Sequence, residues 1–412
     1  MKTYIFTLLL FCIHQTSSAQ GTWTQKANFG DTERHSSVSF SIGTKGYILT
    51  GIDADSSRSD LWEWDQATDT WTEKARFPGT ARYGAVSFSI GTKGYIGTGE
   101  DQDSLRSDFW EWDQATDTWS QKANFGGNAR AYAVGFSIGD KGYIGTGADY
   151  VSVQGNTKDF WEYDQATDVW TQKSDLGGPS RRYATGFSIG EKGYILLGGE
   201  TNIGSYWNDF WEWNKVTDTW TQIGEFPTNF PIYNRVWLVS FVIQNKAYIG
   251  TGFYRCGTNC VVFEDDIWEW DQTTEVWTAK TDFQGEGRDK AIGFSIGEKG
   301  YIGTGHKEAG YLFNDFWEYC PTCIPDGLNE LNNQQNSSII PNPFSNHTTL
   351  QLNEDVKNAT VILYSVNGKQ LKNLPFSGNH LLIEKDDLPS GIYFYQVIST
   401  EQVISSGKMI IQ

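Results

Sequence analysis

Basic residues are scarce in this chain. Lys and Arg together number 32 against 50 Asp and Glu, and the formal net charge at pH 7 is -18. A nucleic-acid-binding protein needs a basic surface to meet the phosphates, so this balance argues against a nucleic-acid partner. The acidic excess suits a soluble protein of the cell surface or the exterior.

Long apolar runs are also missing. The longest candidate, residues 4–13, is too short to cross a bilayer, so we expect no membrane span. Lys2 precedes this run, and the small residues 17–19 (Ser-Ser-Ala) follow it, which is the order of a cleavable export signal. We therefore predict a signal peptide over residues 1–19.

Histidine and cysteine are rare, at five each. Between residues 20 and 319 the only histidines are His35 and His306, which is a thin basis for a copper site. In an exported protein the remaining cysteines are expected as disulfides, as two local bonds or one cross-link, and a zinc site is the alternative. These cysteines are Cys256, Cys260, Cys320 and Cys323. We find no phosphate loop or nucleophile constellation and expect neither a cofactor nor a metal.

Aromatic residues and glycine are abundant, and they recur in units of roughly 50 residues. In the second unit four short β runs, a to d, cover residues 85–90, 94–98, 109–113 and 119–122. Turn sequences separate the runs, and helical periodicity is absent. The pattern predicts an all-β protein with one four-stranded sheet per unit.

The sixth unit ends at Tyr319 without a strand d. The missing strand is present near the other end of the chain, as Thr-Trp-Thr-Gln-Lys at residues 22–26. A ring of sheets must leave no open edge, and this N-terminal strand would complete the sixth sheet. The sequence therefore predicts a six-bladed β-propeller over residues 20–319, closed by its N-terminal outer strand.

The last quarter of the chain has a different pattern. Residues 320–338 are polar and typical of a linker. Residues 339–412 contain short alternating runs at 348–352, 359–365, 381–384, 391–398 and 407–411. We interpret them as a small Ig-like β-sandwich.

The repeated units resemble Kelch repeats. They share an aromatic-aliphatic strand that ends at glycine, then Asp-x-Trp, then a tryptophan strand; only Gly198-Gly199 keeps the paired glycines of that family. The resemblance implies a propeller. Some Kelch-type propellers are copper oxidases or sugar isomerases, so an enzyme acting on sugars is the alternative function.

The tail resembles the C-terminal sorting domain of type IX secretion. The resemblance rests on an ordered set of motifs, which are Pro341-Asn342-Pro343-Phe344, residues 364–369 (Tyr-Ser-Val-Asn-Gly-Lys), Gly391-Ile392-Tyr393 and Lys408-Met409. It implies that the type IX machinery is a partner and that residues 339–412 direct the protein across the outer membrane of a Gram-negative bacterium. The expected location is secreted or on the outer cell surface.

Two charged positions repeat in every unit. An Arg stands six residues before the Phe of strand a, at Arg34, Arg82, Arg130, Arg181, Arg235 and Arg288. An Asp begins strand c, at Asp60, Asp108, Asp159, Asp209, Asp266 and Asp315. Six clustered arginines would repel one another, so we favour structural Arg–Asp pairing. The alternative keeps the six arginines as a ligand-binding funnel for an anion or an acidic sugar.

One position does not repeat. Two residues after each Arg stand Ser36, Gly84, Tyr132, Tyr183, Trp237 and Lys290. The b–c loops and the d–a loop that contains residues 229–232 vary on the same face, and variable loops on a rigid scaffold commonly carry recognition. Tyr132, Tyr183, Trp237 and Lys290 are therefore candidate ligand-binding residues, with inter-blade packing as the alternative. We predict a non-catalytic module that binds a glycan or a protein on this face.

Repetition in all units indicates scaffold for two further groups. The repeated tryptophans are interpreted as packing between blades. The glutamates of strand c are interpreted as solvated residues that face strand-d lysines such as Lys74 and Lys122. No glutamate stands out as the acid or base that an isomerase needs.

Overall fold

The computed structural model describes residues 21–151, 155–200, 205–227, 235–257, 260–323, 337–365, 369–399 and 402–412. The chain divides into two compact units between residues 324 and 325. The predicted signal peptide and most of the predicted linker lie outside the described residues. Apart from one 3-10 turn, η1 (Glu308–Gly310), the regular structure is β-strand. In the described part of the chain no helix is long and apolar enough to cross a membrane.

The described residues of the larger unit form six four-stranded antiparallel sheets. Strand a of each sheet is β2 (Val38–Ile42), β6 (Val86–Ile90), β10 (Val134–Ile138), β14 (Thr185–Ile189), β20 (Val239–Ile243) and β26 (Ile292–Ile296). Strand b is β3 (Lys45–Leu49), β7 (Lys93–Gly97), β11 (Lys141–Gly145), β15 (Lys192–Leu196), β21 (Lys246–Gly250) and β27 (Lys299–Gly303). Strand c is β4 (Leu61–Asp65), β8 (Phe109–Asp113), β12 (Phe160–Asp164), β18 (Asp209–Asn214), β24 (Ile267–Asp271) and β30 (Phe316–Cys320). Strand d is β5 (Thr70–Glu73), β9 (Thr118–Lys122), β13 (Val169–Lys173), β19 (Thr219–Glu225), β25 (Val276–Ala279) and, for the sixth sheet, β1 (Thr22–Lys26).

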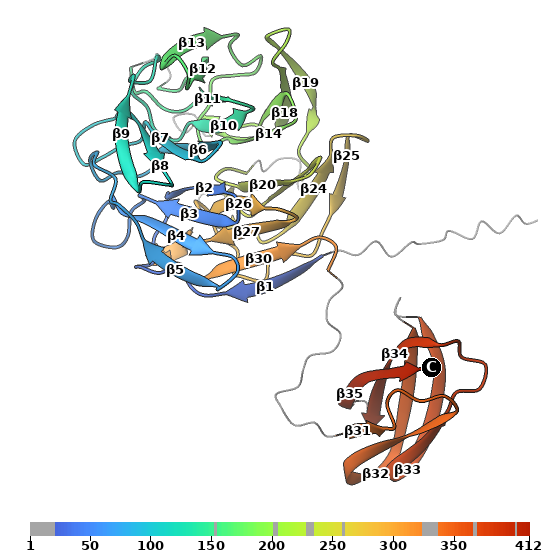
Figure 1. Ribbon diagram of the computed structural model, residues 1–412. Helices are drawn as coiled ribbons and strands as arrows, with labels where there is room; N and C mark the ends of the chain where they lie inside the picture. The colour runs from blue at the N-terminus through green and yellow to red at the C-terminus, as the bar shows by residue number, and fades with distance from the viewer. Residues whose placement is uncertain are drawn as a thin grey trace, which may run out of the picture. The chain divides into compact units, whose positions relative to one another are not determined.

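The sheets follow one another around a centre, as in a β-propeller (Figure 1). Their a strands contact one another in the order β2, β6, β10, β14, β20 and β26, and β26 contacts β2 again. The N-terminal strand β1 pairs with β30, with Trp23 opposite Tyr319 and Gln25 opposite Trp317. This is the pairing that the sequence predicts, and it leaves β30 without a free edge.

The cores lie between neighbouring sheets because the apolar side chains of each strand a pack against the next sheet. In β2 the side chains of Phe40 and Ile42 are buried, while Ser39 and Ser41 alternate with them. The Phe40 ring packs where the next sheet has Gly94, since a Cβ on Gly94 would come within 2.2 Å of Phe40 Cζ. The same close approach recurs at Gly46, Gly142, Gly193 and Gly300, and this explains the glycine before the tyrosine of strand b in every sheet but the fifth, which has Ala247 there.

The tryptophans pack as predicted, but the glutamates differ from their interpretation as solvated residues. Trp64, Trp112, Trp213 and Trp270 are buried at the sheet-to-sheet contacts. Glu111 is buried too, and its Oε2 accepts a hydrogen bond from the Tyr95 hydroxyl at 2.7 Å. Its ion pair is with Lys93 of strand b, which lies beside it. A strand-d lysine does fill this role in the fifth sheet, where the Lys280 ammonium, directly after β25 (Val276–Ala279), lies 3.1 Å from the Glu269 carboxylate.

The smaller unit is built from five strands, β31 (Ser337–Ile340), β32 (His347–Ser365), β33 (Gln370–Glu384), β34 (Gly391–Ser399) and β35 (Gln402–Ile411). Two of the runs expected from the sequence, at 348–352 and 359–365, belong to one long strand, β32, whose register with β33 shifts between Gln351 and Ala359. Phe344, Tyr393 and Met409 from the tail motifs are buried in the core of this unit. The Asn367-Gly368 part of the motif lies outside the described residues.

Candidate ligand-binding face

The repeated arginines are buried, with at most 4 % of each residue exposed. Arg82 shows the common arrangement: its Nη1 and Nη2 donate to Asp108 at 2.6 and 2.8 Å, and Nη1 also donates to the Thr98 carbonyl oxygen at 2.9 Å. The guanidinium carbon lies 4.9 Å from the centroid of the Phe77 ring. The equivalent pairs are Arg34–Asp60, Arg130–Asp159, Arg181–Asp209, Arg235–Asp266 and Arg288–Asp315.

The same aspartates explain the Asp-x-Trp motif. Asp108 also accepts a hydrogen bond from Trp110 Nε1, and the six equivalent distances lie between 2.7 and 3.0 Å. Burial raises the pKa of the Asp108 carboxyl, but the Arg82 hydrogen bonds and charge outweigh it, so the pKa lies below its usual value. These pairs are the structural pairing favoured from the sequence. Because the guanidinium donors are already engaged, we leave the six arginines out of the binding site.

The six non-repeating positions share one unusual backbone conformation. Ser36, Gly84, Tyr132, Tyr183, Trp237 and Lys290 all have φ between 52° and 60°. For all of these but the glycine, the left-handed region costs about 1–2 kcal/mol. The N–H groups of all but Lys290 donate to the carbonyl oxygen of the equivalent residue in the preceding sheet, at 2.8–3.3 Å. The backbone is thus uniform at this ring, while its side chains differ from sheet to sheet.

The large side chains of this ring form a contiguous aromatic arc. The ring centroids of Tyr132 and Tyr183 are 4.8 Å apart, and those of Tyr183 and Trp237 are 4.0 Å apart. The Lys290 ammonium lies 4.5 Å from the Trp237 ring centroid. Gly84 makes room for the Tyr132 ring, since a Cβ there would come within 2.7 Å of Tyr132 Cε1. The structure therefore brings the four predicted residues Tyr132, Tyr183, Trp237 and Lys290 together.

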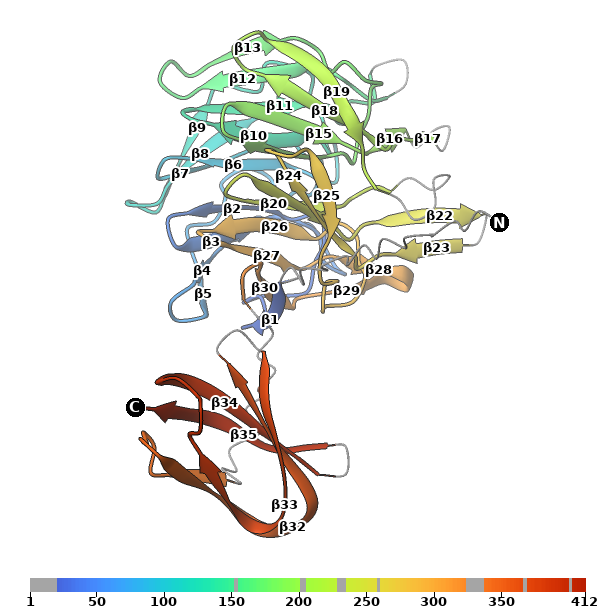
Figure 2. The ribbon, with the colours of Figure 1, turned by 90° about the vertical axis from the view of Figure 1, so that its right-hand side faces the viewer.

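Three b–c loops on this face contain short hairpins. They are β16 (Gly199–Glu200) with β17 (Ser205–Tyr206), β22 (Phe253–Gly257) with β23 (Cys260–Phe263), and β28 (His306–Lys307) with β29 (Tyr311–Leu312). Figure 2 shows all three on the same side of the ring. The predicted variable d–a loop, which contains residues 229–232, lies outside the described residues.

A pocket of about 710 Å³ lies between the aromatic arc and these hairpins. Tyr183, Val236 and Trp237 come from the ring, and Phe253, Arg255, Val261 and Phe263 come from the β22–β23 hairpin. The remaining lining residues are Tyr206, Asp289, Lys290, His306 and Glu308. The volume is that of a small-molecule site.

The described cysteines form two local disulfides. Cys256 is bonded to Cys260 and Cys320 to Cys323, so the cross-link and the zinc alternatives do not apply. The first bond joins β22 to β23 and so constrains the hairpin that lines the pocket. The second follows β30 directly, at the sheet that β1 completes.

The face lined by the six non-repeating positions is called the mouth of the ring below, and His35 and His306 lie side by side on it. The His35 and His306 ring centroids are 5.4 Å apart, and His306 Nδ1 lies 2.9 Å from Asp289 Oδ1. Burial, with Lys290 and His306 nearby, lowers the pKa of His35 to about 3, so this imidazole is neutral at neutral pH. Among the described residues no group of three or more His, Cys, Asp or Glu side chains is arranged to hold a metal ion.

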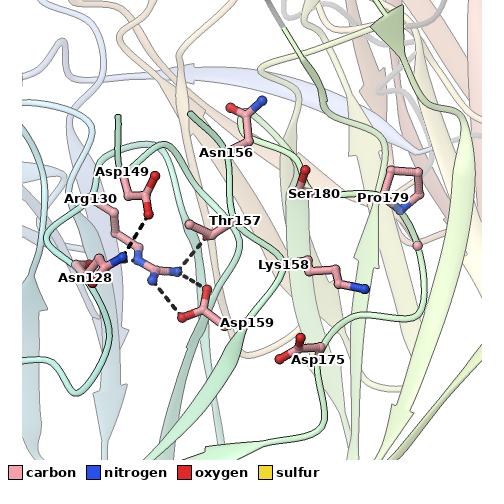
Figure 3. Close-up of a pocket in the computed structure, with 11 residues that line it drawn as sticks. Asn128, Arg130, Asp149, Asn156, Thr157, Lys158, Asp159, Asp175, Pro179 and Ser180 are labelled. Atoms are coloured by element: carbon pink, nitrogen blue, oxygen red, sulfur yellow. Dashed lines mark hydrogen bonds and ion pairs between the residues drawn. The ribbon is translucent and has the colours of Figure 1, made fainter. Parts of the chain in front are cut away.

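A second, more polar pocket of about 510 Å³ lies between the third and fourth sheets (Figure 3). Its lining includes the Arg130–Asp159 pair and Asn128, whose amide donates to Asp149 at 3.0 Å. Asn156 is buried here, and its amide atoms have no hydrogen-bond partner among the residues that the structure describes. The aromatic candidates predicted from the sequence do not reach this pocket.

The sequence analysis did not select a second set of varied residues on this face. The residue directly after each Arg also varies between sheets, as His35, Tyr83, Ala131, Arg182, Val236 and Asp289. Each forms a β-bridge with the start of a b–c loop, for example Val236 with Phe253 and Asp289 with His306. The criterion that selected Trp237, a position that fails to repeat, would have found these residues too.

The comparisons with known proteins concern the two units separately. Residues 338–412 match the family model described as "Secretion system C-terminal sorting domain". The solved structure titled "Structure of YjhT" is similar to this chain with a TM-score of 0.62 at 15% identity, over 71% of this chain and 95% of that one. At that identity the likeness shows the fold alone, which is β-propeller-like. No curated protein matches the sequence.

These findings define the class of protein. It is an all-β protein with repeated four-stranded sheets arranged as in a propeller, followed by a type IX sorting tail. The tail indicates a secreted or cell-surface protein that interacts with the secretion machinery.

Proposed function

We propose that this chain is an exported recognition module that binds a glycan or a protein at the mouth of its ring. The observation that carries the proposal is the ring of six equivalent positions. Their backbone geometry is the same in every sheet, yet their side chains range from serine to tryptophan. A position whose backbone is held constant while its side chain is free to differ is suited to selecting a ligand.

The contrast between buried, paired residues and half-exposed residues supports the proposed recognition function. Groups that repeat, such as Arg82 and Asp108, are buried and paired with one another. Groups that do not repeat, such as Tyr183, Trp237 and Lys290, are half-exposed around a pocket. Amphipathic aromatic side chains beside a polar group are typical of binding sites for sugars and for peptide side chains.

The domain arrangement that we propose has four parts. Residues 1–19 form a signal peptide, 20–319 a six-bladed Kelch-type propeller closed by β1, 320–338 a linker and 339–412 an Ig-like sorting domain. The six four-stranded sheets and the pairing of β1 with β30 support the blade count. The family match over residues 338–412 supports the export route.

The test is a binding screen of the full-length protein against glycan and host-protein arrays, repeated with Trp237→Ala. Trp237 packs on Tyr183 and Phe253, so its removal should weaken binding of the selected ligand roughly tenfold or more. Tyr311→Ala is the matched control, because this exposed aromatic residue lies on the same face but outside the pocket. If Trp237→Ala folds normally and binds every ligand as tightly as the native protein, the proposed site is wrong.

A further inference from the structure

Two donor groups of the aromatic arc have no acceptor among the described residues. The Lys290 ammonium makes no hydrogen bond or ion pair with any of them, and it lies over the face of the Trp237 ring. The Trp237 indole N–H is buried and has no hydrogen-bond partner in the same part of the chain. Buried donors are normally satisfied, so this N–H lacks an acceptor that its burial calls for, while the partly exposed Lys290 ammonium is open to a ligand.

The nearby carboxylates do not accept hydrogen bonds from these two donors. Asp289, the neighbour of Lys290, is buried and engaged with His306 Nδ1 at 2.9 Å. Glu308 lines the same pocket but is solvent-exposed at its rim. Arg255, on the opposite wall, is a second cation that has no ion pair within the described part of the chain.

Most of the remaining lining is apolar. Trp237, Phe253 and Phe263 present aromatic rings, and Val236 and Val261 add aliphatic surface. The Trp237 and Phe253 rings are stacked, with centroids 5.3 Å apart. The Cys256–Cys260 bond closes the hairpin that holds this wall in place.

We infer that this pocket binds a hydrophobic anion: an aromatic or branched apolar body packed on Trp237, Phe253 and Phe263, with its anionic oxygens on Lys290. The inference rests on the proposed function, because it names the chemical class of the group that enters the site at the ring mouth. An ammonium on a half-buried stem forms charge-assisted hydrogen bonds with an anionic group, and these are stronger than neutral ones. The apolar walls contribute through the area that the ligand removes from water.

A matched pair of dyes tests the inference on the full-length protein. Anilinonaphthalene sulfonate and its uncharged parent phenylnaphthylamine have the same rings and differ by the sulfonate. We expect Lys290→Met to weaken sulfonate binding roughly tenfold or more and to change binding of the uncharged dye by about twofold at most. Methionine keeps the apolar stem over the Trp237 ring, so the change removes mainly the charge. Fluorescence titration at low and high salt measures both affinities.

Two controls separate this inference from the proposed function. Lys158→Met removes an exposed lysine at the other pocket and should leave the affinity for both dyes unchanged. Trp237→Ala should lower the affinity for both dyes. Equal binding of the sulfonate to native protein and Lys290→Met would overturn the anion inference. If Trp237→Ala still weakens both dyes in that case, the mouth remains the binding site. If Trp237→Ala changes neither dye nor any ligand from the screen, the proposed function fails as well.

Discussion

Single residues of the larger unit divide into those that hold the sheets together and those that line the pocket proposed as the ligand site. Arg82 and Asp108 belong to the first group, since each satisfies the other at a place from which water is largely excluded. Trp237 and Lys290 belong to the second. Each repeated arginine stands two residues before a non-repeating position, as Arg235 does before Trp237. The spacing in the sequence therefore did not separate the arginines from the candidate site.

Removing one member of a buried pair should destabilise the ring. In Asp108→Asn the Arg82 guanidinium keeps its charge at 1 % side-chain exposure but loses its counterion. We expect the free energy of unfolding to fall by about 3 kcal/mol, as for other buried pairs that lose one partner. Urea unfolding of the full chain measures the loss.

The matched control is Glu73→Gln, because the Glu73–Arg76 pair is exposed and worth less than about 1 kcal/mol. Equal effects of the two substitutions would show that the buried pair does not carry the stability assigned to it.

At the scale of whole strands, β1 is the element on which the ring depends. It is far from β30 in the sequence, yet it supplies the outer strand of the sixth sheet. Trp23 Nε1 donates to the Thr281 carbonyl oxygen at 3.1 Å, and the equivalent bond from Trp119 of the second sheet to the Ala75 carbonyl oxygen is 2.8 Å. The strand supplied by the N-terminus thus contacts the preceding sheet in the same way as a strand d elsewhere in the ring.

Trp23→Ala should therefore weaken the whole larger unit rather than only its end. The Trp23 ring lies 5.0 Å from Phe283 and 4.9 Å from Tyr319 between ring centroids. Losing this packing should cost about 3 kcal/mol in unfolding free energy. Gln25→Ala in the same strand removes an exposed side chain and should cost less than about 0.5 kcal/mol. Hydrogen exchange in β30 would report the opening of the seam, and unchanged protection there would contradict this role for β1.

The whole molecule combines the six-sheet unit, which we propose as a recognition module, with a tail that matches a secretion sorting domain. Phe344, Tyr393 and Met409, which belong to the tail motifs, form part of the core of the smaller unit. The motifs that resemble a sorting domain are therefore also the residues that fold it. The larger unit has its own cores between neighbouring sheets.

A chain that ends at residue 337 should fail to leave the cell. Residues 338–412 match a sorting domain, so without them the larger unit should accumulate inside the outer membrane. Cell fractionation with an antibody against the larger unit measures the distribution, and Trp237→Ala in the full chain serves as an exported control. Export of the shortened chain at the native level would refute the sorting role of the tail.

Much of this fold could be predicted from the sequence because its determinants are local and repeated. The alternation of apolar and polar residues in segments such as Val38–Ile42 is a local pattern, and so are the turn sequences between strands. Comparison of the sixth unit with the other units showed that it lacks a strand d. The Arg–Asp pairing followed from equal numbers of opposite charges at equivalent positions. The interpretation of the glutamates was less accurate, because burial beside Tyr95 depends on how neighbouring sheets pack.

The tertiary structure alone decided which varied residues share a site. Phe253 and Lys290 line one pocket only because the β22–β23 hairpin folds over the ring. The periodicity of the sequence predicts strands, but it does not predict the path of the loop between two strands. The left-handed backbone at Trp237 likewise comes from hydrogen bonds between sheets rather than from a local preference of tryptophan. Local patterns determined the repeated sheets and their order, whereas contacts between residues distant in the chain determined the binding face.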